Sequence, residues 1–158
     1  ERCNQVWEID ITYVPMARGF MYLTAIIDVY SRYIVGWGLS NTLDAASCLE
    51  VLRNAINQHG KPEIINSDQG SQFTCRQYVE YLKTKGIKIS MDGKGRALDN
   101  IYIERFWRTI KYQHIHLFPA VDGLSLYMGI KKWLERYHYR SHQGIDRNKP
   151  STLYLNAA

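Results

Sequence analysis

Asp10 and Asp68 are acidic residues in segments that otherwise have the pattern of buried β-strands. Asp10 lies in the middle of VWEIDITYVP (6–15), in which apolar and polar residues alternate. Asp68 ends the short apolar run PEIINSD (62–68), directly before the turn QGSQ. Aspartate is disfavoured inside strands and is costly to bury without a partner. These acids could serve chemistry; alternatively, Asp10 pairs with a core arginine and Asp68 caps the helix that follows.

A third acid, Glu104, lies in DNIYIERFWRTIK (99–111), whose pattern predicts a helix. At about 100° per residue, isoleucines and Trp107 form an apolar stripe beside a face that holds Glu104, Arg108 and Lys111. Glu104 could simply pair with Arg108 one turn later. A choice between these interpretations depends on whether the fold brings the three acids together.

The remaining pattern predicts the elements that position them. Strands are expected over 6–15, 20–30, 32–40, 62–68 and 86–91, and helices over 44–59, 73–85, 99–111 and 122–139. This order, βββαβαβαα, predicts an α/β three-layer fold with a mixed five-stranded sheet and helices on both faces. In that topology the first strand is central and the fourth lies beside it, so Asp10 and Asp68 approach each other. Glu104 then needs only a helix that crosses the same edge.

Three carboxylates at one edge would repel each other unless cations neutralise them. Hard divalent cations prefer oxygen ligands, so we expect Mg²⁺, with Mn²⁺ as a substitute. Two such ions about 4 Å apart could hold a phosphate, one activating a water or 3′-hydroxyl and the other stabilising the leaving oxygen. The implied reaction is in-line cleavage or transfer of a phosphodiester.

Positive charge is concentrated in the C-terminal part of the chain. Residues 1–92 contain 9 Lys and Arg against 10 Asp and Glu, whereas residues 93–158 contain 11 against 5. A polyanion such as nucleic acid should therefore meet the C-terminal part, although a basic surface could also serve solubility alone.

Composition indicates one globular domain over residues 1–158. The chain is 46% hydrophobic and 22% charged, with a net charge of +5. No apolar run approaches the roughly 18 residues needed to cross a bilayer, and no signal-peptide core is present at the start, so no membrane partner is expected. Three cysteines without metal-ligand spacing suggest neither a disulfide framework nor a zinc site. We expect a cytoplasmic protein.

Four segments taken in order resemble a known family. WEIDITYV, IDVYSRYIVGW, INSDQGSQF and DNIYIERFWRTIK resemble the catalytic core of retroviral-type integrases, specifically the transposases of bacterial insertion sequences. The 35 residues between Asp68 and Glu104 match the spacing of that family's Asp, Asp-35-Glu motif. Lys111 matches the basic position after the motif's Glu. The resemblance runs from about Trp7 to Tyr154 and includes the closing YHYRSHQGIDRNKPSTLY.

The resemblance implies a ribonuclease H-like fold and a two-metal catalytic site of Asp10, Asp68 and Glu104. It implies a DDE-type transposase that cleaves transposon DNA ends and transfers them to target DNA. The active complex is expected to be a homodimer or higher multimer, associated with the bacterial nucleoid, and an N-terminal DNA-end-binding region is expected outside this chain. A catalytically inactive, domesticated DNA-binding module of the same fold and a ribonuclease H-like nuclease remain alternatives.

Other residues have less specific assignments. The predicted DNA contacts are Lys94, Arg96, Arg108, Lys111, Arg140, Arg147 and Lys149. The alternatives are a flexible loop around the first two of these residues and a solvated basic tail over about 137–158. Asn66 and Gln69 flank Asp68 and are predicted to orient it or a water. Asp99 and Asn100 are predicted to cap the helix that carries Glu104. Asp28 is expected to fix the turn that follows it.

Overall fold

The sheet of the protein is mixed and five-stranded, as the sequence predicts. The computed structural model describes residues 1–93 and 100–157. The sheet consists of β1 (Val6–Pro15), β2 (Phe20–Asp28), β3 (Ile34–Ser40), β4 (Ile64–Ser67) and β5 (Lys88–Met91). Their order is β3-β2-β1-β4-β5. The β1–β2–β3 meander is antiparallel, and β4 and β5 continue the sheet in parallel with β1. The central strand therefore carries Asp10, and its neighbour β4 leads to Asp68.

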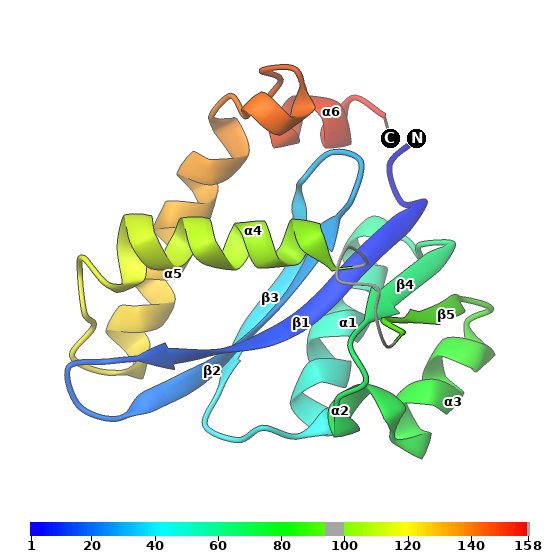
Figure 1. Ribbon diagram of the computed structural model, residues 1–158, viewed down its shortest axis with the longest axis horizontal. Coiled ribbons are helices and arrows are strands. Elements are labelled where there is room, and N and C mark those ends of the chain that lie inside the picture. The colour runs from blue at the N-terminus through cyan, green and yellow to red at the C-terminus, as the bar shows by residue number, and fades with distance from the viewer. Residues whose placement is uncertain (94–99, 158) are drawn as a thin grey trace.

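Helices cover both faces of this sheet (Figure 1). They are α1 (Ala45–His59), α2 (Ser71–Thr74), α3 (Arg76–Thr84), α4 (Ile101–Ile110), α5 (Gly123–Tyr139) and α6 (Pro150–Leu155), with a π-helical turn η1 (Lys111–Ile115) and a 3₁₀ turn η2 (Gln143–Ile145). One apolar core joins the sheet to α1 and α3, and a second joins it to α4 and α5. Among the described residues, no helix is both long and apolar enough for a membrane crossing.

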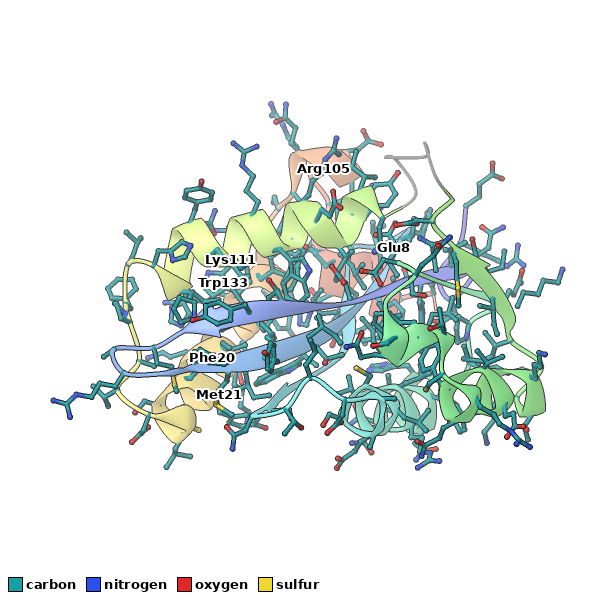
Figure 2. All side chains as sticks on the ribbon, turned by 60° about the horizontal axis from the view of Figure 1, so that its bottom comes forward. Glu8, Phe20, Met21, Arg105, Lys111 and Trp133 are labelled. Carbon is teal, nitrogen blue, oxygen red and sulfur yellow. The ribbon has the colours of Figure 1, made fainter. Side chains whose placement is uncertain are left out.

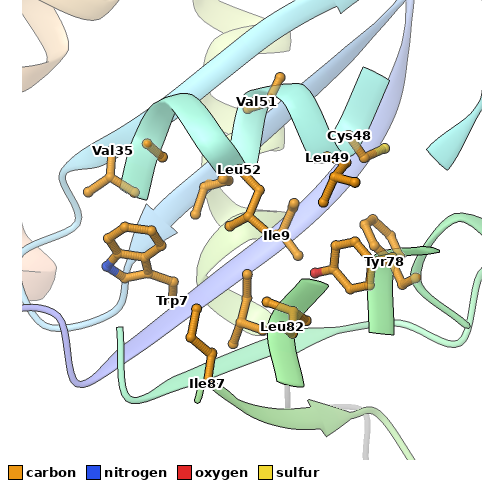
Figure 3. Close-up of a cluster of buried hydrophobic side chains, with 14 of the residues drawn as sticks. Trp7, Ile9, Val35, Cys48, Leu49, Val51, Leu52, Tyr78, Leu82 and Ile87 are labelled. Carbon is orange, nitrogen blue, oxygen red and sulfur yellow. The ribbon is translucent and has the colours of Figure 1, made fainter. Parts of the chain in front are cut away.

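Side-chain alternation along β1 separates the two cores. Trp7 and Ile9 lie in the core with α1 and α3, together with Leu52 and Leu82 (Figure 3). Val14, five residues after Ile9 and therefore on the opposite side, lies in the core with α4 and α5. The even-numbered residues of β1, Asp10 among them, thus face the α4 layer.

Local sequence accounts for where several elements begin and end. Asp44 caps α1, because its Oδ1 accepts a hydrogen bond from the Ser47 amide at 2.8 Å. Gly60 ends the same helix with a positive φ of 78°. Asp28 fixes the β2–β3 turn as predicted, accepting hydrogen bonds from the Ser31 amide and hydroxyl.

Two predicted segments differ from the structure. The single helix predicted over 73–85 is divided into α2 and α3 at Cys75, whose ψ of 151° is extended. The basic tail predicted over about 137–158 contains two further elements, η2 and α6. Its Tyr154 stacks on Tyr33, with ring centroids 4.7 Å apart. These two elements, of three and six residues, are too short for helix periodicity to identify.

Candidate active site

Asp10 is the most enclosed of the three predicted acids. It is partly buried, and its Oδ2 accepts a hydrogen bond from the Trp107 indole Nε1 at 3.0 Å. Burial raises the pKa of Asp10, the Trp107 hydrogen bond opposes that shift, and the charges of Asp68 and Glu104 raise the pKa further. Asp68 and Glu104 are therefore near enough to Asp10 for their charges to act on it.

Asp68 follows β4 and is held in a tight turn by Gly70. The Asp68 Oδ1 accepts a hydrogen bond from the Gly70 amide at 2.8 Å, so the helix cap considered for this carboxylate is replaced by a turn. A Cβ at position 70 would lie 2.9 Å from the same Oδ1. Gly70 thus permits this position of the carboxylate. The pattern of strand and turn residues gave no reason to single out Gly70.

Glu104 lies on the exposed side of α4. The ion pairs found between described residues are Arg2–Glu63 and Arg76–Glu80, so the predicted alternative of a Glu104–Arg108 pair is not formed there. The side chains of Glu104 and Arg108 are both exposed. Glu104 is therefore not neutralised by the neighbour that its helical spacing suggested.

The three acids share an edge but do not form a closed metal cage. Across residues 1–93 and 100–157, no group of three or more acidic, histidine or cysteine side chains is close enough together to hold a metal ion. Asp68 and Glu104 are exposed, so their side chains can rotate towards Asp10 without disturbing either core. Three carboxylates are also the donor set that hard divalent cations prefer. In donor chemistry, the three acids thus match the ligands that Mg²⁺ prefers.

A row of polar contacts joins the α4 side of β1 to the helix that carries Glu104. Three successive even-numbered strand residues accept hydrogen bonds from three helical residues spaced four apart. The pairs are Glu8 Oε2 with the Ile103 amide at 2.7 Å, Asp10 Oδ2 with Trp107 Nε1 at 3.0 Å, and Thr12 Oγ1 with Lys111 Nζ at 2.6 Å. We call these three contacts the polar ladder.

Glu8 was not identified from the sequence as a site residue, although it lies two residues before Asp10 on the same face. It is only 2% exposed, and burial raises its pKa to about 7, while hydrogen bonds from the Ile103 and Tyr102 backbone oppose that shift. Glu8 therefore supplies the acceptor at the start of α4. Asn100 occupies the N-cap position as predicted, but its side chain makes no cap bond.

Asn66 holds residues on both sides of the segment 94–99. Its Nδ2 donates to Asp92 Oδ1 at 3.0 Å and to Asn100 Oδ1 at 3.3 Å, which explains why the Asn100 side chain is turned away from the helix amides. Gln69 Nε2 donates to the Asp92 carbonyl at 2.9 Å. These two amides thus organise the chain beside Asp68, and their predicted contact with Asp68 or a water stays a prediction. Lys94, Arg96 and Asp99 lie outside the described residues.

Models of the integrase core domain family match residues 1–97 and 85–150. The chain belongs to the integrase core domain family. The family resemblance drawn from the sequence is thereby confirmed.

Two transposases are similar to this integrase core in sequence. The transposase for insertion sequence element IS904 of Lactococcus lactis is 35% identical over 151 residues, covering 93% of this chain and 60% of the transposase. Transposase InsF for insertion sequence IS3A of Escherichia coli is 34% identical over 115 residues, covering 72% of this chain and 40% of the transposase. The chain thus spans 40% to 60% of the length of these relatives.

Solved structures confirm the ribonuclease H-like fold of this integrase core. The catalytic core domain of HTLV-2 integrase, in complex with magnesium, superposes with a TM-score of 0.76 at 18% identity, with 97% of each chain covered. A simian T-cell lymphotropic virus intasome bound to the PP2A regulatory subunit B56 gamma gives 0.82 at 16% identity, covering 97% of this chain and 55% of the other. At these identities the likeness concerns the fold.

Among the described residues, the predicted DNA-contacting cations occupy two regions. On α4, Arg108 is exposed, and Figure 2 shows Arg105, which sequence reasoning missed, on the side away from the sheet, whereas Lys111 lies between the helix and β1. Burial lowers the pKa of Lys111 and the charge of Asp10 opposes this shift. In the C-terminal segment, Arg140 Nη2 donates to Gln113 Oε1 at 2.9 Å, and two further exposed cations precede α6, namely Arg147 and Lys149.

Proposed function

We propose that this integrase core domain is the catalytic core of a DNA transposase that cleaves transposon ends and joins them to target DNA. Asp10, Asp68 and Glu104 would hold two Mg²⁺ ions, with Mn²⁺ as a substitute. The observation that carries the proposal is geometric: β1 and β4 pair in parallel with Glu8 opposite Asn66, which sets Asp68 level with Asp10, and the Trp107 hydrogen bond brings α4, which carries Glu104, to Asp10. The named relatives, both transposases, support DNA as the substrate.

The protein residues would divide the work as follows. Trp107 fixes one oxygen of Asp10, so the central ligand is held before DNA arrives. Asp68 and Glu104 rotate inwards to complete the ligand set. When bound, the two ions would activate the attacking oxygen and stabilise the departing one. In the reaction, a water or 3′-hydroxyl oxygen forms a bond to phosphorus while the bond to the opposite oxygen breaks.

Exposed cations on α4 and in the C-terminal segment would bind the DNA backbone. Arg108 on α4 and Arg140, Arg147 and Lys149 farther along the chain are the proposed phosphate contacts, as are Lys94 and Arg96. Lys111 lies beside Asp10 and would contact the phosphate nearest the reaction. The active complex would be a homodimer or higher multimer on the bacterial nucleoid, as intasome formation by a structural neighbour suggests.

The test measures cleavage and strand transfer by the full-length protein on labelled transposon-end DNA, with Mg²⁺ or Mn²⁺. Asp10→Asn, Asp68→Asn and Glu104→Gln should each abolish both reactions while DNA binding persists. Glu80→Gln is the matched control, because Glu80 is an exposed acid on α3 that pairs with Arg76, and it should leave both rates unchanged.

Two outcomes would refute the proposal in favour of its alternatives. DNA binding without any metal-dependent chemistry would indicate an inactive DNA-binding module. Preferential cleavage of the RNA strand in RNA–DNA hybrids would indicate a ribonuclease.

A further inference from the structure

We propose that Glu8 is a positioning residue: its buried carboxylate anchors the first turn of α4 to β1 and thereby sets where Glu104 stands relative to Asp10. The inference rests on the proposed function in assigning Glu104 and Asp10 to one site. It adds a residue that does not touch the DNA or the reacting atoms and acts through the helix that carries Glu104.

The first turn of α4 depends on an acceptor from another element. The first amides of any helix lack partners within the helix. Asn100, at the N-cap position, makes no side-chain cap bond, and Glu8 Oε2 accepts from the Ile103 amide at 2.7 Å instead. Ile103 directly precedes Glu104, so the contact lies one residue from the proposed ligand. Figure 2 shows Glu8 between the strands and the start of α4.

The spacing of the polar ladder sets the position of α4 along β1, and Glu8 makes one of its three contacts. Two residues along a strand advance about 6.7 Å, and four residues along a helix advance about 6.0 Å. Each of Glu8, Asp10 and Thr12 therefore lies level with its hydrogen-bond donor on the helix. A slip of the helix by one residue would break all three rungs together. The ladder thus defines one position of α4 along β1, and Glu8 holds the rung nearest Glu104.

The environment of Glu8 explains why an acid suits this rung. The amides at the start of α4 and the positive end of the helix dipole favour a negative charge. Arg32, whose guanidinium lies 3.9 Å from the centre of the Tyr102 ring, adds positive charge beside the same first turn. Burying an acid is costly. Capping alone would not require it, because Ser or Asp at position 100 could cap α4 from its own chain. An anchor on β1 does what a local cap does not: it ties the helix to the strand that carries Asp10.

The experiment compares three variants of the full-length protein with the wild type. Glu8→Ala removes the anchor, and Glu8→Gln keeps an acceptor oxygen of the same reach. Asp44→Ala removes the cap of α1, a helix that carries no proposed site residue. Cleavage kcat, KM for transposon-end DNA and the Mg²⁺ concentration for half-maximal rate are measured, together with amide hydrogen exchange at Ile103 and Glu104.

Glu8→Ala should lower kcat about 10- to 100-fold and raise the required Mg²⁺ concentration, because a misplaced supporting residue weakens the metal site by that order. KM for DNA should stay within about twofold, since the proposed phosphate contacts are unchanged. Exchange at Ile103 and Glu104 should become about tenfold faster. Glu8→Gln should restore most of kcat, and Asp44→Ala should leave kcat and the α4 exchange rates unchanged.

Two results would overturn the inference. Unchanged kcat in Glu8→Ala with faster exchange at Ile103 would show that the anchor does not affect the site. Equal loss of activity in Glu8→Gln and Glu8→Ala with unchanged exchange would show that the Glu8 carboxylate acts in the chemistry itself. Failure of the proposed function looks different, because Glu104→Gln would then be active while Glu8→Ala still loosened α4. If Glu8→Ala does not fold, Glu8→Asp, one methylene shorter, gives the same tests.

Discussion

The two faces of the central strand differ in what holds them to their helices. Towards α1 and α3, Trp7 and Ile9 enter a core built almost entirely from apolar side chains. Towards α4, Glu8, Asp10 and Thr12 of the same strand make directed hydrogen bonds. Because successive strand residues point to opposite faces, one ten-residue segment serves both layers.

The two faces of β1 separate the stability of the fold from the positioning of the site. Apolar contacts are non-directional and tolerate small shifts of a helix, whereas hydrogen bonds weaken steeply as their angles depart from linear. The α1 face can therefore supply cohesion, and the α4 face can fix where Glu104 lies. Variants on the first face should change stability alone, and variants on the second should also change catalysis.

The largest stability change is expected from truncating one buried side chain in either core. Leu52→Ala on α1 and Ile103→Ala on α4 both truncate fully buried residues and should each lower the free energy of unfolding by about 2–5 kcal/mol. Only Ile103→Ala should also lower kcat at a temperature where both variants are folded. Denaturant unfolding and cleavage assays check this. An equal fall of kcat in both variants would contradict the separation of the two faces.

A pH-dependent stability should come from the α4–α5 layer, through His138. This imidazole accepts a hydrogen bond from the Ile34 amide, and burial, with the neighbouring His142 and His59, lowers its pKa from 6.5 to about 4. Below pH 6.5 the unfolded chain takes up a proton that the folded His138 resists, so stability falls as pH drops towards 4. The loss should total roughly 3 kcal/mol.

The check is the free energy of unfolding of the wild type and His138→Gln between pH 7 and 4. The difference between the two proteins isolates His138 from the carboxylates that titrate in the same range. The difference should shrink as pH falls. A difference independent of pH would mean that His138 is protonated as easily in the folded chain as in the unfolded one.

Removing the middle rung of the polar ladder should have a moderate effect on stability. Trp107→Phe deletes the indole N–H that donates a hydrogen bond to Asp10. Hydrogen bonds to charged groups contribute about 1.5–3 kcal/mol to stability. Cleavage kcat should fall about 10- to 100-fold, because Asp10 loses the group that orients it. Trp133→Phe, in the same core but on α5, is the control for lost ring volume and should keep kcat. Equal kcat in the two variants would argue against the ladder.

Gly70→Ala is expected to change stability least while it slows cleavage. Its φ of −60° and ψ of 151° suit any residue, so Gly70→Ala should gain about 0.4–1 kcal/mol through the unfolded chain. The new Cβ would lie 2.9 Å from both Asp68 Oδ1 and Gln72 Oε1, so both side chains must move, and loss of the Asp68 turn bond offsets that gain. Cleavage should therefore slow while thermal stability stays nearly unchanged. Gly93→Ala, at an open position, is the control, and full activity of Gly70→Ala would show that the Asp68 turn is not required.

Much of the fold followed from sequence, because its pattern is local. Alternation in β1 and the helical stripe around Trp107 predicted their elements, and the element order predicted that β4 lies beside β1. The break at Cys75 was missed, since no Gly or Pro lies between Phe73 and Thr84 to mark it. The folded C-terminal segment was missed because tertiary contacts such as Tyr154 on Tyr33 stabilise it.

Within the site, the placement of acids along the chain could be predicted, but their partners could not. Glu8 looked like an ordinary strand residue, because the amide it meets is 95 residues away. Lys111 was expected to share the face of Arg108 and contact DNA, yet its long flexible stem lets the ammonium reach Thr12. Which way such a side chain turns depends on the neighbouring strand, and the periodicity of one helix does not contain that information.

The most direct test of the account is to locate bound Mn²⁺ by anomalous scattering in crystals of the full-length protein with a transposon DNA end. We expect Mn²⁺ between Asp10, Asp68 and Glu104, with Glu8 still bonded to the Ile103 amide, and loss of this Mn²⁺ in Asp10→Asn. Mn²⁺ bound elsewhere in a protein that still cleaves DNA would contradict it.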